Sequence, residues 1–306
     1  MTRIIAFLAV ILLAISAGAA STTSTNVDIT VTHAGSSNTA LPTPPAGFHW
    51  TQTFGDEFNT TFPNSGTANA PVTLDTSTWQ LDHYCGNPNF TVYASPTYGC
   101  GGNTTASDVV SNGILTMTIQ TSTPATRNII DTWRVAGDGP ANHQHITGFV
   151  QRYGYFVYDA KLPTCSSAEW DLESFARDVW TGGVYGELAW AMQKGVCNYS
   201  SFFTYEIDNN RNIHYFGNPN VGVDVTQAFH QYGVLWTNDG SPHGSVVVYF
   251  DGNPITSAYH LVSPGFDNGL FFDIYWSPDN IGGQGSSIGG ASMQFDWIRA
   301  YQLAPN

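Results

Sequence analysis

Residues 153–163 read Tyr-Gly-Tyr-Phe-Val-Tyr-Asp-Ala-Lys-Leu-Pro. The run is rich in aromatic and β-branched residues, which favour an extended backbone. Proline has no backbone N–H to donate, so Pro163 stops a ladder of strand hydrogen bonds. The stretch therefore predicts a strand over residues 148–162 that ends at Pro163.

Short runs of the same kind, separated by turn residues, fill the chain on both sides of this strand. Asn112-Gly113, with alternating apolar and polar residues after it, indicates a hairpin over residues 109–120. Further strands are expected at 170–176, 187–192, 202–207, 212–216, 231–237, 245–250, 270–276 and 294–302. Many short strands at this spacing predict an all-β fold, a two-sheet antiparallel β-sandwich or jelly roll.

The composition restricts the class of partner. The 306 residues include 9 basic and 23 acidic side chains, a formal charge of −14. Nucleic acids and anionic membranes bind basic surfaces, so neither is expected as a partner. Only 10% of the residues are charged, whereas 14% are aromatic and 31 are glycine. This composition is typical of exported β-sandwiches that bind neutral glycans, and we expect a monomer without a cofactor.

The N-terminus has the pattern of an export signal. Arg3 precedes an apolar run over residues 4–15, and small residues follow it. This pattern predicts a secretory signal peptide over residues 1–20. Residues 21–46, rich in Ser, Thr and Pro, are expected to form a flexible linker. One β domain over residues 47–304 then completes a secreted or periplasmic protein, with no later apolar run long enough to span a bilayer.

Export permits disulfides, and the chain has four cysteines. Three pairings are possible. We favour Cys85–Cys100, which would close a loop rich in Gly, Asn and Pro, and Cys165–Cys197, which would bracket an acidic stretch. The spacing fits no zinc site. Residues 143–145, His-Gln-His, have the spacing of metal ligands but no third ligand nearby, so no metal is expected.

The acidic stretch is residues 169–173, Glu-Trp-Asp-Leu-Glu. In a strand, Glu169, Asp171 and Glu173 lie on one face and Trp170 lies on the other. Three acids on one short strand repel one another and cost desolvation, which packing alone explains poorly. Two carboxylates with a third acid between them suit hydrolysis of a glycosidic bond. The alternative is a solvated acidic face on an acidic protein.

Seven segments, in order along the chain, carry a resemblance. They are Phe54-Gly-Asp-Glu-Phe-Asn59, Leu74-Asp-Thr-Ser-Thr-Trp79, Asn112-Gly-Ile-Leu115, Tyr153 to Pro163, His230-Gln-Tyr-Gly-Val-Leu-Trp236, Val248-Tyr-Phe-Asp-Gly252 and Phe295-Asp-Trp-Ile-Arg-Ala-Tyr-Gln302. Together they resemble the family 16 glycoside hydrolases, the laminarinase and lichenase group. The resemblance implies a concanavalin A-like jelly roll that cleaves β-linked glucans. Asp56 and Glu57 are expected to be structural.

The family's catalytic strand reads GEIDIxE or EIDIE, with the nucleophile first, the acid/base last and an Asp between them. By spacing, the similar strand here begins with Gly186-Glu187. The resemblance then implies Glu187 as the nucleophile. Ala189 replaces the Asp, and Met192, or Ala191 in the short form, replaces the acid/base. Without an acid to protonate the leaving oxygen, hydrolysis falls by about 10²–10⁴.

By residue type, the motif is instead Glu169, Asp171 and Glu173, one strand earlier. If this strand and the one that carries Glu187 are antiparallel neighbours, the catalytic acids have moved sideways onto the adjacent strand. On this hypothesis Glu169 is the nucleophile, Glu173 the acid/base and Asp171 the modulator, with Glu187 as the alternative nucleophile. Residues four apart in a strand lie roughly 13 Å apart, so the pair needs a concave strand to reach the about 5–5.5 Å of a retaining enzyme.

Aromatic side chains supply candidate sugar contacts. Trp170, Trp190 and Trp276 are candidates because indole faces stack on pyranose rings, and the resemblance places Trp276 in the cleft. The alternative for each is core packing. Glu206 and Asp208 imitate the start of the catalytic motif, but their position by the family's layout favours a surface hairpin.

The sequence therefore predicts an exported, endo-acting, retaining hydrolase of a β-linked polysaccharide, such as a β-1,3- or mixed-linkage glucan. The alternative is a glycan-binding pseudoenzyme in which Glu187 is a relic and the aromatic residues bind the glycan. Release of reducing ends from laminarin or lichenan separates the two.

Overall fold

The computed structural model describes residues 38–59, 65–67, 70–72, 75, 78–81, 108–118, 128–132, 135–136, 144–145, 148–163, 169–176, 184–194, 200–277 and 292–306. For several strands, among them residues 169–176 and 275–277, it gives the backbone course alone. The chain divides into residues 1–30 and 31–306, and every described residue belongs to the second unit. The predicted signal peptide, the four cysteines and His143 lie outside the described residues.

Nine strands form the back sheet. Their order is β17-β16-β15-β10-β20-β6-β5, with β1 paired to β20 and β18 paired to β16. The strands are β1 (Phe48–Asp56), β5 (Asp108–Ser111), β6 (Ile114–Thr118), β10 (Gly154–Lys161), β15 (His230–Thr237), β16 (Ser245–Phe250), β17 (Asn253–Pro254), β18 (Tyr259–His260) and β20 (Ser292–Pro305). All of these strand pairs are antiparallel.

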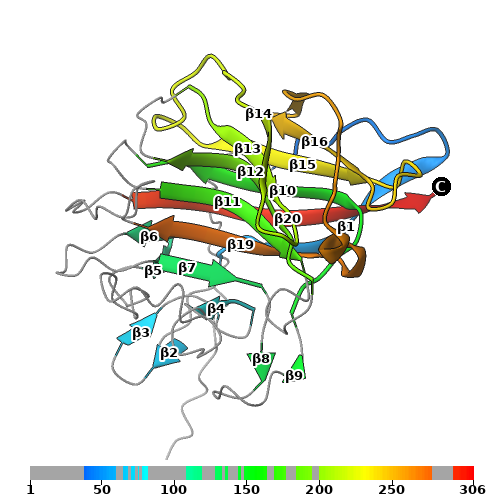
Figure 1. Ribbon diagram of the computed structural model, residues 1–306. Helices are drawn as coiled ribbons and strands as arrows, with labels where there is room; N and C mark the ends of the chain where they lie inside the picture. Colours follow the sequence, from blue (N-terminus) through cyan, green and yellow to red (C-terminus); the bar gives the residue numbers. More distant parts are fainter. Residues whose placement is uncertain are drawn as a thin grey trace, which may run out of the picture. The chain divides into compact units, whose positions relative to one another are not determined.

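Seven strands form the front sheet, in the order β14-β13-β12-β11-β19-β7-β4. The strands are β4 (Gln80–Leu81), β7 (Asn128–Asp131), β11 (Glu169–Ala176), β12 (Glu187–Lys194), β13 (Phe203–Ile207), β14 (Ile213–Gly217) and β19 (Leu270–Ser277). All six strand pairs are antiparallel. Figure 1 shows β12, β11 and β19 running across the view alongside β10 and β20 of the back sheet.

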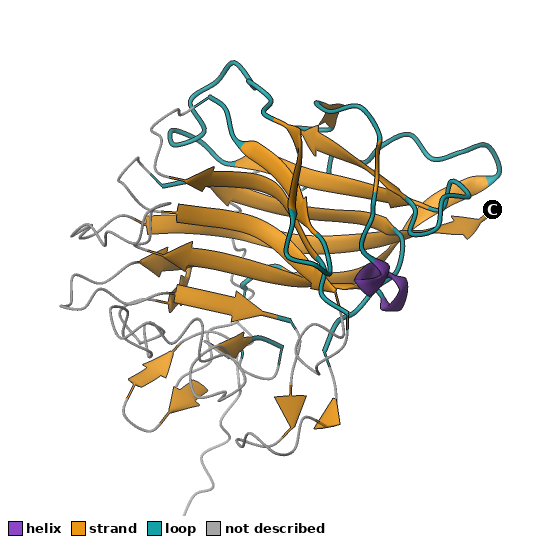
Figure 2. Ribbon diagram, viewed as in Figure 1, coloured by secondary structure: helices purple, strands orange, loops and turns teal. Residues whose placement is uncertain are grey.

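Short elements complete the described part of the chain. Two ribbons pair β2 (Ser65–Thr67) with β3 (Ala70–Val72) and β8 (Val135–Ala136) with β9 (Gln144–His145), and η3 (Pro264–Asn268) is a 3-10 helix. Figure 2 shows strands and loops nearly everywhere, with η3 as the coiled element. None of the described helical turns has the length and apolarity to cross a membrane.

The core lies between the two sheets. Phe156 and Tyr158 of β10, Trp190 of β12 and Phe272 of β19 are fully buried in one cluster. Tyr158 stacks on Trp190 with ring centroids 5.4 Å apart, and the indole N–H of Trp190 donates to the carbonyl oxygen of Tyr232, 3.2 Å away. Burial of such large aromatic surfaces is the main stabilising term of a sandwich. The all-β sandwich predicted from the sequence is confirmed.

This core packing corrects one predicted sugar contact. Trp190 has no exposed surface, because it fills the space between the sheets. An indole without an exposed face cannot stack on a pyranose ring. The prediction of Trp190 as a substrate-binding residue is therefore wrong, and its alternative, core packing, holds.

The predicted hairpins and strand ends agree with the structure in most places. The Asn112-Gly113 turn joins β5 to β6, with φ angles of 53° and 76°, the left-handed pair that favours these two residues. The strand expected over residues 148–162 is shorter and begins only at Gly154. Its start is displaced because Tyr153 and Gly154 both have positive φ angles, of 60° and 121°.

The end of the predicted linker is not flexible. The backbone N–H of Ala40 donates to Gln231 Oε1 (2.6 Å), and Gln231 Nε2 donates to the carbonyl oxygen of Asn38 (2.8 Å). Trp50 Nε1 donates to the carbonyl oxygen of Pro42 (2.6 Å). These bonds fix residues 38–42 on the back sheet, so the boundary placed at residue 46 is several residues too late.

The two acids of the opening strand are structural, as expected. Trp79 Nε1 donates to Asp56 Oδ2 (2.6 Å). Glu57 accepts two hydrogen bonds of 2.7 Å from the Arg299 guanidinium, a bidentate pair between β20 and the end of β1. These contacts tie the first strand to the last.

Gly154 gives a test of the β10 start. A Cβ on Gly154 would lie 2.1 Å from the carbonyl oxygen of Tyr301, and φ there is +121°. We expect Gly154→Ala to lower the free energy of unfolding by about 2–4 kcal/mol, measured in urea. The control is Gly240→Ala, where φ is +90° but no atom lies within 4 Å of the added Cβ. Equal losses in the two variants would show that backbone conformation, not the clash, limits this position.

Candidate active site

The strands that carry the two candidate motifs are antiparallel neighbours. β11 pairs with β12 along its whole length. The hypothesis that the catalytic acids have moved onto the adjacent strand requires this arrangement, because it puts the acids of residues 169–173 beside the strand of Glu187. Glu187 lies on β12, and its assignment to the family's catalytic strand stays a prediction.

Glu187 begins β12 and faces the side of the front sheet away from the core. It is buried, with 8% of its surface exposed. The hydroxyl of Tyr205 donates to Glu187 Oε1 (2.5 Å), and the hydroxyl of Tyr185 donates to Oε2. Donors to the ionised form favour a carboxylate over the protonated acid. The two tyrosines therefore hold Glu187 in one orientation as an acceptor, a role that the sequence analysis did not predict for either of them.

A β-bulge in β12 decides which residues share the face of Glu187. The register with β13 runs from Ala189 opposite Tyr205 to Met192 opposite Phe203, with two residues between them on β12. Ala189 and Met192 pack with Tyr205, whereas Trp190 and Ala191 belong to the core between the sheets. Met192, rather than Ala191, thus occupies the position that the resemblance gives to the acid/base.

The register brings the acids of β11 to the vacated positions. Glu173 lies opposite Ala189, and Asp171 lies opposite Met192. Residues directly opposite in an antiparallel pair share a face. By register, each missing carboxylate of β12 has an acidic residue as its neighbour on β11.

Spacing distinguishes the possible carboxylate pairs. Glu169 and Glu173 are four residues apart on one strand, roughly 13 Å between Cα atoms. Glu173 and Glu187 are diagonal neighbours across the two strands, since Glu173 pairs with residue 189. Diagonal neighbours lie about 7–8 Å apart, within reach of glutamate side chains for a retaining pair. Glu169 pairs with Lys194 and Ser277 at the far end of the strand.

β19 adds an acid that the sequence analysis missed. Asp273 is fully buried and lies opposite Glu173 on the other side of β11. The register thus sets an acidic residue of β19 beside one of β11. The available signal was Asp273 itself, the single acid in the apolar strand expected over residues 270–276.

The remaining predicted site residues, Trp170 and Trp276, lie at the same end of the front sheet as Glu169. Trp170 pairs with Trp276 across β11 and β19. Their side chains are outside the described part of the structure, so their roles as sugar contacts stay predictions. In the described residues, no three His, Cys, Asp or Glu side chains gather to hold a metal ion.

An aromatic edge borders the site. Tyr215 of β14 lies opposite Tyr205 and is 54% exposed. Its ring makes edge contacts with Phe203 and Tyr205, with centroids 5.9 and 6.0 Å apart. Tyr215 was not predicted as a candidate, because its segment alternates like any edge strand.

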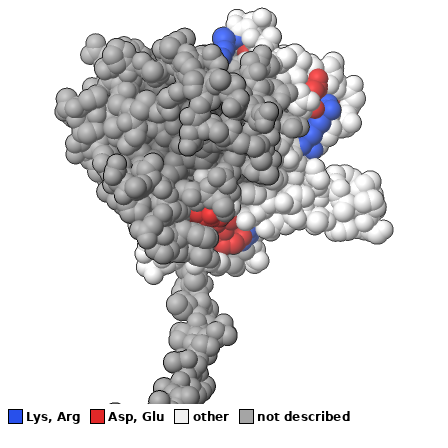
Figure 3. Space-filling view, turned by 90° about the horizontal axis from the view of Figure 1, so that it is seen from below, with Lys and Arg blue, Asp and Glu red and all other residues white. Residues whose placement is uncertain are grey.

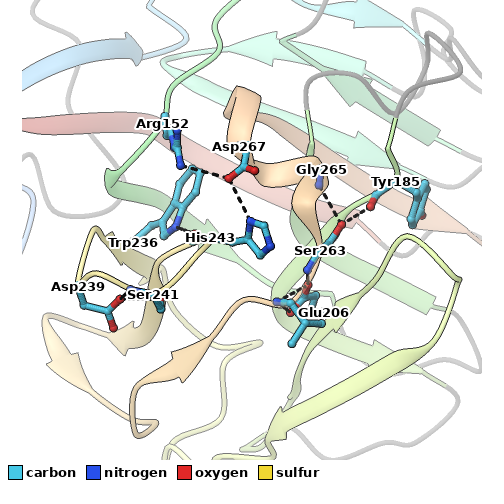
Figure 4. A network of polar contacts seen from close by, with 11 residues as sticks. Arg152, Tyr185, Glu206, Trp236, Asp239, Ser241, His243, Ser263, Gly265 and Asp267 are labelled. Carbon is cyan, nitrogen blue, oxygen red and sulfur yellow. Dashed lines mark hydrogen bonds and ion pairs between the residues drawn. The ribbon is translucent and has the colours of Figure 1, made fainter.

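The prediction that Glu206 lies on a surface hairpin is wrong for its side chain. It is fully buried, and its carboxylate accepts from the backbone N–H groups of Ser263 (2.6 Å) and Val262 (3.0 Å). Burial raises the pKa of Glu206 above its ordinary value, although these donors act in the opposite direction. Figure 4 shows Glu206 and Ser263 next to Tyr185, the residue that donates to Glu187. The β13–β14 hairpin itself is as expected.

The pH dependence of stability tests the buried Glu206. Because its pKa is raised, the folded protein keeps this proton to higher pH than the unfolded chain does. Relative to Glu206→Gln, which keeps an acceptor oxygen, the wild type should lose stability as pH rises from about 4 to 7. Urea unfolding at several pH values measures this.

Asp208 is the control for Glu206, because its pKa is shifted in the opposite direction. Hydrogen bonds from His214 and Asn212 lower the pKa of Asp208, so its contribution is present at neutral pH and is lost as pH falls below about 4. Relative to Asp208→Asn, the wild type should therefore gain stability as pH rises through that range. If the stability of the wild type relative to Glu206→Gln and relative to Asp208→Asn changed in the same direction with pH, the opposite pKa shifts assigned to Glu206 and Asp208 would be wrong.

Comparison with known proteins shows which proteins the chain is similar to. No family model matches the sequence. The endo-1,3-1,4-beta-glycanase EglC of Rhizobium meliloti (strain 1021) is 25% identical over 269 residues, which are 83% of this chain and 52% of that protein. The chain thus spans about half the length of this curated relative.

Solved structures share the fold. The laminarinase from Flavobacterium sp. UMI-01 is 20% identical and has a TM-score of 0.57, over 82% of this chain and all (100%) of that one. The laminarinase catalytic domain from Thermotoga petrophila RKU-1 is 17% identical, with a TM-score of 0.58 over 83% and 98% of the two chains. SCLam, an endo-beta-1,3(4)-glucanase from family GH16, is 18% identical, with a TM-score of 0.58 over 85% and 94%. The chain therefore has the jelly-roll fold of these glucanases, and its sequence is similar to that of an endo-1,3-1,4-beta-glycanase.

Proposed function

We propose that this chain is an endo-acting, retaining hydrolase of a β-1,3- or mixed-linkage glucan. The observation that carries the proposal is Glu187, oriented by two tyrosine hydroxyls on the strand next to Asp171 and Glu173. The names of the relatives, an endo-1,3-1,4-beta-glycanase and several laminarinases, support the substrate class. The low share of charged residues, 10%, suits a neutral polysaccharide.

In this proposal Glu187 is the nucleophile. Its carboxylate forms a bond to the anomeric carbon as the glycosidic C–O bond breaks, and a neighbouring carboxylic acid gives its proton to the leaving oxygen. The same group, now a carboxylate, takes a proton from water as water cleaves the glycosyl ester. The hydroxyls of Tyr185 and Tyr205 keep the Glu187 carboxylate in position for both steps.

Glu173 is the acid/base that the register favours. It is the diagonal neighbour of Glu187, at about 7–8 Å between backbones, and glutamate side chains can close that gap to the separation of a retaining pair. Asp171, opposite Met192, is placed to modulate it. The earlier hypothesis, with Glu169 as the nucleophile, requires a concave strand to shorten a separation of roughly 13 Å.

The aromatic edge supplies a surface for the glucan chain. Tyr215 offers an exposed ring on the side of the front sheet that carries Glu187. Figure 3 views the molecule from below, where the visible described residues are mostly uncharged and a few acidic and basic atoms form small patches. A neutral sugar ring binds to an exposed aromatic ring such as that of Tyr215 through stacking, without ion pairs.

The alternative function is glycan binding without cleavage. The observation that favours it is the replacement of two catalytic carboxylates by Ala189 and Met192. In that case the tyrosines merely satisfy a buried relic, Glu187. Export through the signal at residues 1–20, action outside the cell and a monomeric state belong to the proposal in either form.

Activity measurements separate the two functions. We expect the wild type to release reducing ends from laminarin or lichenan. Glu187→Ala should lower kcat by about 10³-fold or more, and Glu173→Gln by about 10²–10⁴-fold, because each removes a group that acts in the transition state. Asp239→Asn, in the turn after β15, is the control. If the wild type binds both glucans but releases no reducing ends, the binding function replaces the hydrolase.

Azide rescue assigns the two roles. Azide can attack the anomeric carbon in place of a deleted nucleophile, so Glu187→Ala should give a glycosyl azide of inverted configuration. In Glu173→Ala, azide should instead open the glycosyl ester and give the retained configuration. Rescue by inversion in Glu169→Ala, with Glu187→Ala still active, would move the nucleophile to Glu169.

Tyr215→Ala tests the aromatic edge. Loss of one stacking ring should raise KM for laminarin roughly 3- to 10-fold while kcat changes little, since the ring binds substrate and transition state alike. Leu303→Ala removes an exposed apolar residue from the back sheet and is the matched control. Equal KM values for Tyr215→Ala and the wild type would remove this residue from the binding surface.

A further inference from the structure

Two loops hold Tyr185 from three directions. Its backbone N–H donates to Asn209 Oδ1 (2.9 Å), and its carbonyl oxygen accepts from the hydroxyl of Ser263. The guanidinium carbon of Arg211 lies 3.4 Å from the centroid of its ring. These contacts leave the Tyr185 hydroxyl directed at Glu187.

The Arg211 backbone is unfavourable for an arginine. Its φ angle is 65°, in the left-handed region that glycine and asparagine prefer. The residue closes the β13–β14 turn, where its N–H donates to the carbonyl oxygen of Asp208 (2.9 Å). Glycine is the usual choice for such a turn position. The turn alone therefore does not explain an arginine, whereas the cation on the Tyr185 ring does.

Asp208 fixes the same turn. Its carboxylate accepts from the backbone N–H groups of Asn210 (2.8 Å) and Asn212 (2.9 Å), and it pairs with His214 Nε2 (2.9 Å). These bonds lower the pKa of Asp208, so it is ionised at neutral pH. Arg211 is thus presented to Tyr185 from a turn with a defined backbone.

The other side of Tyr185 rests on η3. Figure 4 shows Ser263 between Tyr185 and Glu206. The Ser263 hydroxyl accepts from the N–H of Gly265 (3.1 Å) as well as donating to Tyr185. A Cβ on Gly265 would lie 2.6 Å from the carbonyl oxygen of Val184. This close approach fixes the Tyr185 backbone against η3, while the ring of Tyr185 contacts Arg211.

We propose that Arg211 is a positioning residue that acts through Tyr185 on Glu187. A cation on the face of a phenol ring binds to its π electrons and strengthens the phenol as a hydrogen-bond donor. The Tyr185 hydroxyl then holds the Glu187 carboxylate ionised and oriented, as a nucleophile requires. The inference rests on the proposed role of Glu187, but its structural part does not depend on catalysis.

Other titratable groups surround Glu187. Tyr205 donates to it from β13, Asp208 and His214 lie in the adjoining hairpin, and the register places Glu173 diagonally across on β11. Arg211, in the same hairpin as Asp208, contacts the ring of Tyr185. Removing Arg211 should therefore act on Glu187 through one hydroxyl and leave the contact with Tyr205 in place.

Arg211→Gly tests the proposal without straining the fold. Glycine accepts the left-handed φ angle, so thermal stability should stay equal or rise. We expect kcat on laminarin to fall roughly 3- to 10-fold with little change in KM, and the acidic limb of the kcat/KM profile to move to higher pH. Arg211→Lys, which keeps a cation, should lie between the wild type and Arg211→Gly. Asn112→Gly, in the β5–β6 turn, is the backbone control.

A readout without substrate makes the outcome independent of the proposed function. The hydroxyl proton of Tyr185 should give a slowly exchanging downfield NMR resonance, assigned by its loss in Tyr185→Phe. In Arg211→Gly this resonance should move upfield and exchange faster. An unchanged resonance and unchanged kcat overturn the inference, whatever the enzyme does. If the resonance moves but the wild type cleaves no glucan, the positioning role stands and the hydrolase function fails.

Discussion

The candidate site depends on two consecutive core residues in one strand. Trp190 and Ala191 of β12 both face the back sheet, where Trp190 stacks on Tyr158 and bonds to the backbone of Tyr232. A regular strand alternates its faces, so two successive core positions require a bulge. The bulge returns Met192 to the face of Glu187 and Ala189. A large indole buried between the sheets thus fixes which side chains line the site.

The candidate carboxylates lie on two strands. Glu187 is the acid in the sequence of β12, which has Ala189 and Met192 on the same face, and the register sets Glu173 and Asp171 opposite those two positions. Acids on adjacent strands repel one another, and Asp273 on the far side of β11 adds to that cost. An arrangement that is unfavourable for stability is retained more readily where it binds or transforms a ligand.

The carboxylate of Glu187 depends on loops far away in the chain. Tyr185 reaches it from the start of β12, but Tyr185 is held by a turn near residue 210 and by η3 near residue 264. Glu206 ties η3 to β13 by accepting from the Ser263 backbone. The edge of the front sheet, a turn and η3 therefore form one support for a single side chain, and a change in any of them reaches the site.

The sequence by itself determined most of the longer strands, the hairpins, the sandwich and the acidic candidates, because strand alternation and turn residues are local properties. It also gave Glu187 by spacing. Only the tertiary structure decided that Met192 rather than Ala191 faces the site, that Trp190 is core, and that Glu206 is buried, since each depends on packing between sheets. Asp273, Tyr205 and Arg211 escaped prediction for the same reason: their partners lie 18 to 100 residues away, and only the register and the turns bring them together.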